Sequence, residues 1–437
     1  MQTNRLFIAL GLAFASSAHS ANLGDVYRDA LAYDAQYASA RAAYRAGLEK
    51  LPQGRAGLLP NVNLEGNVRW NDVNSNIPGG DNTYTSNGLA LSAAQPLFRM
   101  QNRVQYKQAK LQVKVAEGQF KSAEQDLILR VAGAYFDVLQ AEDNIAFIQS
   151  QKVAISGQLD SAKRNFEVGT ATITDTHEAQ ARFDLATAQE IAAQNDREIR
   201  LRSLQRLVGK FPGKLAPLTD KAHLKLPEPR VIDDWVSRAS NANLQTDIQR
   251  NLKLIADQEV ERNRAGHYPT LDATASYSLN NNTQSFGGTN ADTRAAVVGL
   301  ELNLPIYQGG LISSKVREAV ANQEKARSDL ENAQREAALQ ASQAYLNVTN
   351  GEAQVKALEQ ALVSSQAQLD STKLGLQVGV RTNLDVLNAQ QQVFSAKRDL
   401  AAARYNFILS GLNLRAAVGS LNAADLAEVD QYLTAAK

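Results

Sequence analysis

Residues 378–385 read Val-Gly-Val-Arg-Thr-Asn-Leu-Asp, and residues 168–175, which lie 210 positions earlier, read Val-Gly-Thr-Ala-Thr-Ile-Thr-Asp. Both stretches follow a long segment without proline, and in both five mostly polar or small residues separate a Val-Gly pair from an aspartate. Glycine ends a helix because it accepts a left-handed backbone, and threonine and aspartate favour the start of the next helix. Each stretch therefore predicts the turn of a helical hairpin, and the chain is expected to contain two hairpins in tandem.

The duplication extends beyond these turns. Pro96-Leu97-Phe98 matches Pro305-Ile306-Tyr307 at an offset of 209, and Ala134-Tyr135 matches Ala344-Tyr345 at an offset of 210. Proline and glycine positions that recur at a nearly constant offset are not expected from chance similarity between alanine-rich helices. The sequence therefore predicts one architecture built from two repeats, with the following division: a signal peptide at 1–20, repeats at 21–209 and 233–419, a linker at 210–232 and a C-terminal tail at 420–437.

The first 20 residues are typical of a secretory signal peptide. Arg5 provides a short positive region, residues 6–15 an apolar core, and Ala18-His19-Ser20 a cleavage site before Ala21. No later apolar run approaches the roughly 20 residues that a spanning helix needs. The sequence predicts an exported protein that could still cross a membrane as strands.

Composition and motifs argue against an enzyme. The net charge is +1, which does not favour a nucleic-acid partner, and the absence of cysteine excludes disulfides and thiolate metal sites. The four histidines are not at a metal-ligand spacing, and no phosphate-binding glycine loop or nucleophile elbow is present. We expect no catalytic residue, no metal and no cofactor.

Four segments of about ten residues alternate between apolar and polar side chains, which is typical of strands. In the first of them, Val62, Leu64, Val68 and Trp70 alternate with polar neighbours. The predicted strands are residues 61–70, 83–95, 270–279 and 295–304. Helical patterns cover residues 22–58, 99–167, 174–207 and 233–266, and the second repeat is expected to follow the same plan as the first. Apolar residues between Leu127 and Ile148 are spaced alternately four and three apart, as in coiled coils.

Four strands cannot close a sheet in lipid, because an open edge leaves backbone polar groups unpaired. Eight strands would leave little lumen and twelve a wide one, so we expect three copies to assemble. The predicted fold class is mixed α and β: a trimeric 12-stranded transmembrane β-barrel, with four strands from each protomer, continued by a long α-helical barrel. The alternative is a structural or adhesive trimeric coiled coil without a channel, which would have no use for the strands.

At this point the sequence resembles a known family. The signal peptide, the strand–loop–strand units followed by long helices, and both Val-Gly turns resemble the TolC family of outer-membrane channel-tunnel proteins, over essentially the whole mature chain. The most specific parts are residues 378–388 and the ending Val418-Gly419-Ser420-Leu421. The resemblance implies a homotrimer in the outer membrane, with a helical barrel in the periplasm.

The resemblance also implies a function and partners. Such a duct docks with a periplasmic adaptor (membrane fusion) protein and an inner-membrane ABC or proton-driven transporter, and exports secreted proteins or drugs. Type I secretion and multidrug efflux both remain open, because the transporter selects the cargo. The turn residues would contact the adaptor: Val168, Gly169, Thr170, Val378, Gly379 and Val380.

Family members close the periplasmic tip with polar links and a ring of carboxylates. Carried onto this chain, Asp175 and Arg381 would form a link that holds the tip helices inward, and Asp385 would line the constriction. The alternative is that these acids only complement the N-termini of helices.

Two residues depart from the family pattern. Asn388 occupies the position of a second carboxylate, and Leu376 that of a gate tyrosine. Glu178 lies 210 positions before Asn388 and three after Asp175, and thus on the same helical face as Asp175. Our hypothesis is that Glu178 restores the missing negative charge at the mouth.

Overall fold

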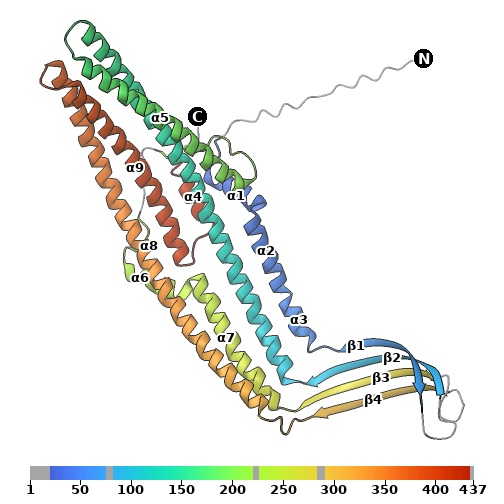
Figure 1. Ribbon diagram of the computed structural model, residues 1–437. Coiled ribbons are helices and arrows are strands. Elements are labelled where there is room, and N and C mark those ends of the chain that lie inside the picture. The colour runs from blue at the N-terminus through green and yellow to red at the C-terminus, as the bar shows by residue number, and fades with distance from the viewer. Residues whose placement is uncertain (1–19, 75–81, 220–225, 283–290, 434–437) are drawn as a thin grey trace, which may run out of the picture. The chain divides into compact units, whose positions relative to one another are not determined.

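A computed structural model describes residues 20–74, 82–219, 226–282 and 291–433 of the chain (Figure 1). Nearly all of the predicted signal peptide lies outside these residues, as do the middle parts of both predicted inter-strand loops. Among the described helices, none combines the length and apolar character that a membrane span requires.

Helices and strands follow each other in nearly the same order in both halves of the chain, except that a 3-10 turn stands in place of the third helix and one more helix follows the second repeat. The first half contains α1 (Leu23–Tyr33), α2 (Ala35–Leu48), α3 (Lys50–Ala56), β1 (Asn61–Val73), β2 (Asn82–Phe98), α4 (Met100–Glu167) and α5 (Ile173–Val208). The second half contains α6 (Ile232–Ala242), α7 (Leu244–Arg264), the 3-10 turn η1 (Ala265–His267), β3 (Thr270–Asn282), β4 (Ala291–Asn303), α8 (Leu311–Gln377), α9 (Asn383–Ala417) and α10 (Ala423–Asp430). Each strand is longer than the segment predicted for it.

Two helices that were predicted as continuous are interrupted. The segment 22–58 breaks at Asp34, whose Oδ1 accepts the N–H of Tyr37 at 2.7 Å. The segment 233–266 breaks at Asn243, whose Oδ1 accepts the N–H of Gln245 at 2.8 Å. Short polar side chains cap a helix in this way because its first N–H groups lack partners within the helix. Asp34 and Asn243 are 209 positions apart, so the break belongs to the duplicated plan.

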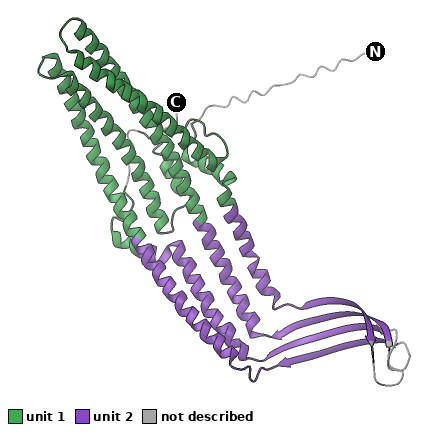
Figure 2. Ribbon diagram, in the orientation of Figure 1, with its two compact units in different colours: residues 1–38, 123–236, 340–437 green, residues 39–122, 237–339 purple. Residues whose placement is uncertain are grey.

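The described residues form two compact units (Figure 2). Unit 1 comprises Met1–Ala38, Ala123–Val236 and Gln340–Lys437, and unit 2 comprises Ser39–Ser122 and Ser237–Leu339. Each unit combines segments of both sequence repeats, so the compact units follow a different division from the repeats. The reason is the length of α4 and α8, whose residues belong partly to one unit and partly to the other.

Unit 2 contains one antiparallel sheet with the strand order β1-β2-β3-β4, so that β1 and β4 form its edges. The register gives the sheet two different faces. One row across it is apolar and consists of Val62, Ala93, Ala275 and Val298. The neighbouring row, on the opposite face, is mostly polar and consists of Asn63, Ser92, Ser276 and Val297. The apolar face is well exposed, with Val298 85% and Val68 76% accessible.

An ion pair in unit 2 joins the sheet to the helix that follows it. Arg99, between β2 and α4, donates from Nε to Asp272 Oδ1 of β3 at 2.8 Å. Asp272 is buried. A carboxylate taken out of water needs such a partner, so the pair fixes the start of α4 against the sheet.

Unit 1 holds both ends of the described chain. The Tyr135 hydroxyl of α4 is buried and donates to the carbonyl oxygen of Ala216 at 2.8 Å. Asp430 of α10 accepts the N–H groups of Leu23 and Gly24 at 2.8 and 3.1 Å, and thereby caps α1. The predicted C-terminal tail thus contains a helix, α10, which itself begins with a capping box at Asn422.

Candidate functional site

The two Val-Gly turns join α4 to α5 and α8 to α9 (Figure 1). They have nearly the same backbone geometry. Gly169 and Gly379 both have φ of 77°, a left-handed value that side chains disfavour. The N–H of Thr170 donates to the carbonyl of Asn165 at 2.8 Å, and the N–H of Val380 donates to that of Gly375 at 2.9 Å. Each turn thus pairs the last carbonyls of one helix before the next helix begins.

The two aspartates after the turns form capping boxes. The Asp175 carboxylate accepts the N–H of Thr172 at 3.0 Å, and the Asp385 carboxylate accepts that of Thr382 at 2.9 Å. Hydrogen bonds from the backbone and hydroxyl of Thr382 lower the pKa of Asp385, and the charge of Arg381 adds to the effect. The structure therefore gives both acids the helix-capping role that was the alternative interpretation. Their roles in a gate remain predictions.

The expected link between Asp175 and Arg381 is not formed within one chain. The carboxylate of Asp175 is engaged by Thr172, whose hydroxyl also lies 3.0 Å from it. The Arg381 side chain is exposed and makes no hydrogen bond or ion pair with any residue that the structure describes. Leu376, at the position of the family's tyrosine, packs against the core of its own hairpin, including Leu369.

Glu178 and Asn388 are brought together by a residue that sequence reasoning missed. Arg182 of α5 donates from Nη2 to Asn388 Oδ1 of α9 at 2.9 Å, and from Nη1 to Gln391 Oε1 at 3.4 Å. The same guanidinium lies 3.6 Å from the carboxylate of Glu178, one helical turn earlier. The charge of Glu178 is therefore partly balanced within the chain. No local pattern reveals this contact, since Arg182 and Asn388 are 206 residues apart.

Beside Arg182, a small apolar cluster joins the two hairpins. It contains Ile155 of α4, Ala186 of α5 and Leu387 of α9, all of them buried, with Phe183 packed against it. Each hairpin also has its own cluster near the turn, around Leu159 in the first and Leu369 in the second. Each hairpin is therefore packed around its own cluster near the turn, and the cluster of Ile155, Ala186 and Leu387 joins the two hairpins.

The turns themselves present apolar side chains to solvent. Val168 is 72% accessible, Val378 66% and Val380 73%. Gly169, Thr170 and Gly379 are also exposed. Exposed valines at both turns are suited to contact with another protein, because their burial there would be favourable.

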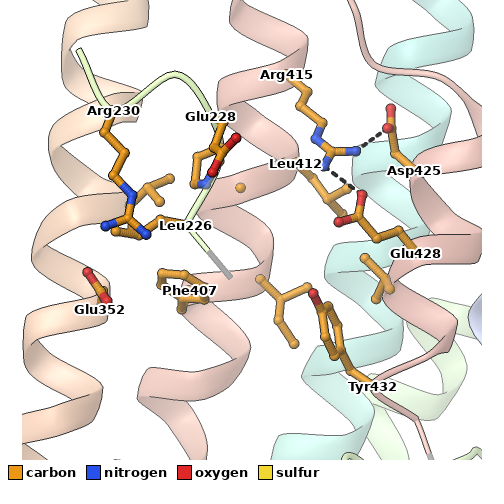
Figure 3. Close-up of a pocket in the computed structure, with 15 residues that line it drawn as sticks. Leu226, Glu228, Arg230, Glu352, Phe407, Leu412, Arg415, Asp425, Glu428 and Tyr432 are labelled. Atoms are coloured by element: carbon orange, nitrogen blue, oxygen red, sulfur yellow. Dashed lines mark hydrogen bonds and ion pairs between the residues drawn. The ribbon is translucent and has the colours of Figure 1, made fainter. Parts of the chain in front are cut away.

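A second candidate site is a cavity of about 600 Å³ in unit 1, between α8, α9 and α10 (Figure 3). On one side, Arg415 donates to the carboxylates of Asp425 and Glu428, the latter at 2.6 Å. Arg230 and Glu352 lie on the other side. The bonds of Arg415 run from α9 to α10, so this cluster fastens the C-terminal helix, and none of the site residues predicted from the sequence lines the cavity.

Known proteins match this chain along nearly its whole length. The family model for outer membrane efflux proteins matches residues 26–210 and 249–420. Outer membrane protein TolC of Vibrio cholerae is 34% identical, over 99% of this chain and 98% of that protein. The alkaline protease secretion protein AprF of Pseudomonas aeruginosa is 34% identical, over 96% of this chain and 89% of that protein.

Solved structures agree with the fold. The channel CusC superposes with a TM-score of 0.79 at 17% identity, over 91% of this chain and 92% of that chain. The open state of the MtrE outer membrane channel of Neisseria gonorrhoeae superposes with a TM-score of 0.76 at 20% identity, over 92% of this chain and 90% of that chain. Together with the family match, these similarities establish that the chain belongs to the outer membrane efflux protein family.

Proposed function

We propose that this chain is the outer-membrane exit duct of a tripartite export system. It docks with a periplasmic adaptor and an inner-membrane transporter, and carries secreted proteins or small toxic compounds out of the cell. The observation that carries the proposal is the sheet with one apolar and one polar face, attached to two helical hairpins. Such a sheet suits lipid on one side and water on the other. The relatives include both secretion and efflux proteins, so their names favour neither cargo.

Three copies assemble to form this duct. The edge strands β1 and β4 carry backbone groups that need partners in lipid, and pairing β1 of one copy with β4 of the next provides them. Three four-stranded sheets then make a closed sheet of about twelve strands, wide enough for a water-filled lumen. The relatives give no support to the alternative of a structural or adhesive coiled coil.

The hairpin tips form the periplasmic mouth. The exposed turn residues Val168, Gly169, Thr170, Val378, Gly379 and Val380 dock with the adaptor, and the charged residues behind them control passage. Asp385 and Glu178 supply negative charge at the mouth, and Asn388 stands among them as a neutral partner. Asp175 and Arg381 meet in the assembled trimer, where Arg381 of one copy is free to reach a neighbouring copy.

The docking proposal is tested by crosslinking, for which a chain without cysteine is convenient. A Val378→Cys variant carrying a photoreactive maleimide should capture the adaptor in cells that produce both proteins. The matched control is Ile306→Cys, which is also highly exposed, at 93%, but precedes α8. Equal capture at both positions, or none at Val378, would contradict docking at the tips. Light scattering in detergent should give three times the mass of the protomer.

A further inference from the structure

The contact between the two hairpins of one chain has a polar part that the family resemblance does not assign. Arg182 of α5 reaches across to α9, where Asn388 and Gln391 accept its hydrogen bonds at 2.9 and 3.4 Å. About three quarters of the Arg182 side chain is buried. No other hydrogen bond or ion pair between described side chains joins α5 to α9, so Arg182 alone makes the polar connection between these helices.

We propose that Arg182 is the clasp of the periplasmic mouth: it holds the second hairpin against the first, and its release from Asn388 lets the two part. This inference rests on the proposed function as a duct, and adds the residue that sets how readily the mouth opens. The clasp differs from the expected Asp175–Arg381 link, because it acts within one protomer and uses a neutral acceptor on α9.

The chemistry of the contact fits a link that opens and closes again. A charged donor bound to neutral amide oxygens is held less tightly than an arginine–carboxylate pair, which is often bidentate. Glu178 stays on the same helix as Arg182, at 3.6 Å, so it can keep the guanidinium partly paired after Asn388 has moved away. When Asn388 moves away, the Arg182 guanidinium therefore still has a carboxylate partner, and the free-energy cost of opening stays small.

Packing beside the clasp is also incomplete. A cavity of about 40 Å³ lies between α4, α5 and α9, with Arg182 and four glutamines among its lining residues: Gln151, Gln189, Gln390 and Gln391. Gln390 is only 7% exposed, and its Oε1 has no hydrogen-bond partner among the described residues. A polar cavity of this size admits water, which can take over the hydrogen bonds of Arg182 as the hairpins separate. A permanently closed core would be expected to exclude such groups.

The test compares single-channel currents of purified trimers in planar bilayers. Arg182→Gln should raise the mean conductance several-fold and lengthen the open periods, because the link to Asn388 is lost. Asn388→Asp should lower both, since a carboxylate converts the contact into an ion pair. The matched control is Arg200→Gln, which removes the same charge from α5. Its partner Asp137 lies on α4 of the same hairpin, at 2.9 Å, so the conductance should not change.

A second variant tests the contact without depending on charge. Arg182→Cys combined with Asn388→Cys places the only two thiols in the chain on facing helices. A flexible bis-methanethiosulfonate reagent should return the enlarged conductance of this variant to the wild-type level, and a reducing agent should restore the enlarged state. If Arg182→Gln conducts like the wild type, or if crosslinked trimers stay open, Arg182 is not the clasp. A wild-type trimer without any conductance would instead refute the duct itself.

Discussion

The two faces of the sheet make a prediction that can be worked out from the register. Val297 and Val298 are adjacent in the middle of β4 (Ala291–Asn303), but they lie in rows on opposite faces. A strand of 13 residues spans about 44 Å, or about 30 Å along the membrane normal when tilted by about 45°, which matches the apolar core of a bilayer. In the proposed barrel, both valines therefore lie near the midplane of the membrane, and only Val298 faces lipid.

Replacing Val298 with lysine should destabilise the assembly strongly. A lysine on the lipid face at the midplane costs about 2–4 kcal/mol in each protomer, and roughly three times as much in a trimer. The control, Val297→Lys, places the same charge among the polar residues Ser92 and Ser276, and should change stability by less than about 1 kcal/mol. The assay is guanidinium unfolding of trimers reconstituted in lipid vesicles. If both variants lose the same stability, the assignment of the faces is wrong.

Three further predictions concern the helices. Arg130 donates two hydrogen bonds to the buried Asp34 and lowers its pKa, so the stability that this carboxylate provides is present above about pH 4 and is lost as the pH falls below it. Asp34→Asn should cost about 1–3 kcal/mol of unfolding free energy at pH 7. It should also reduce the loss of stability at acidic pH, measured by denaturant unfolding at a series of pH values. Tyr405→Phe removes the 2.6 Å hydrogen bond to Asp143, and should lower the unfolding free energy by about 1–2 kcal/mol. Gly379→Ala should cost about 1–2 kcal/mol by thermal circular dichroism, from backbone strain alone, because no atom beyond the neighbouring residues in the chain lies within 4 Å of the added Cβ.

Much of the fold follows from local patterns. The turns were predictable because a glycine with left-handed backbone and a following Thr-x-x-Asp box are local requirements, and both copies meet them. The strands were predictable from alternation, although β4 gives a weaker signal. Its segment Ala295-Ala296-Val297-Val298 is apolar on both faces. The two faces can therefore be told apart only by the cross-strand partners, Ser276 for Val297 and Ala275 for Val298. The breaks at Asp34 and Asn243 were not predicted, because aspartate and asparagine also occur inside helices.

The site was harder to predict, because its contacts connect distant parts of the chain. Asp175 and Asp385 were selected as gate residues through the family resemblance. In the structure, each aspartate forms a capping box with the threonine three residues before it. Arg182 has no distinguishing local feature in the sequence. Its contact is with Asn388, which is 206 residues away in the chain and is brought near only by tertiary packing. Glu178 was selected for its negative charge, and in the structure its carboxylate lies 3.6 Å from the guanidinium of Arg182.

The proposed water-filled duct through the outer membrane is tested most directly by the current through single purified trimers in a planar bilayer. We expect discrete, long-lived openings with a preference for cations, because Asp385 and Glu178 are proposed to supply negative charge at the mouth. Folded trimers that insert into the bilayer but carry no current at any voltage would contradict it.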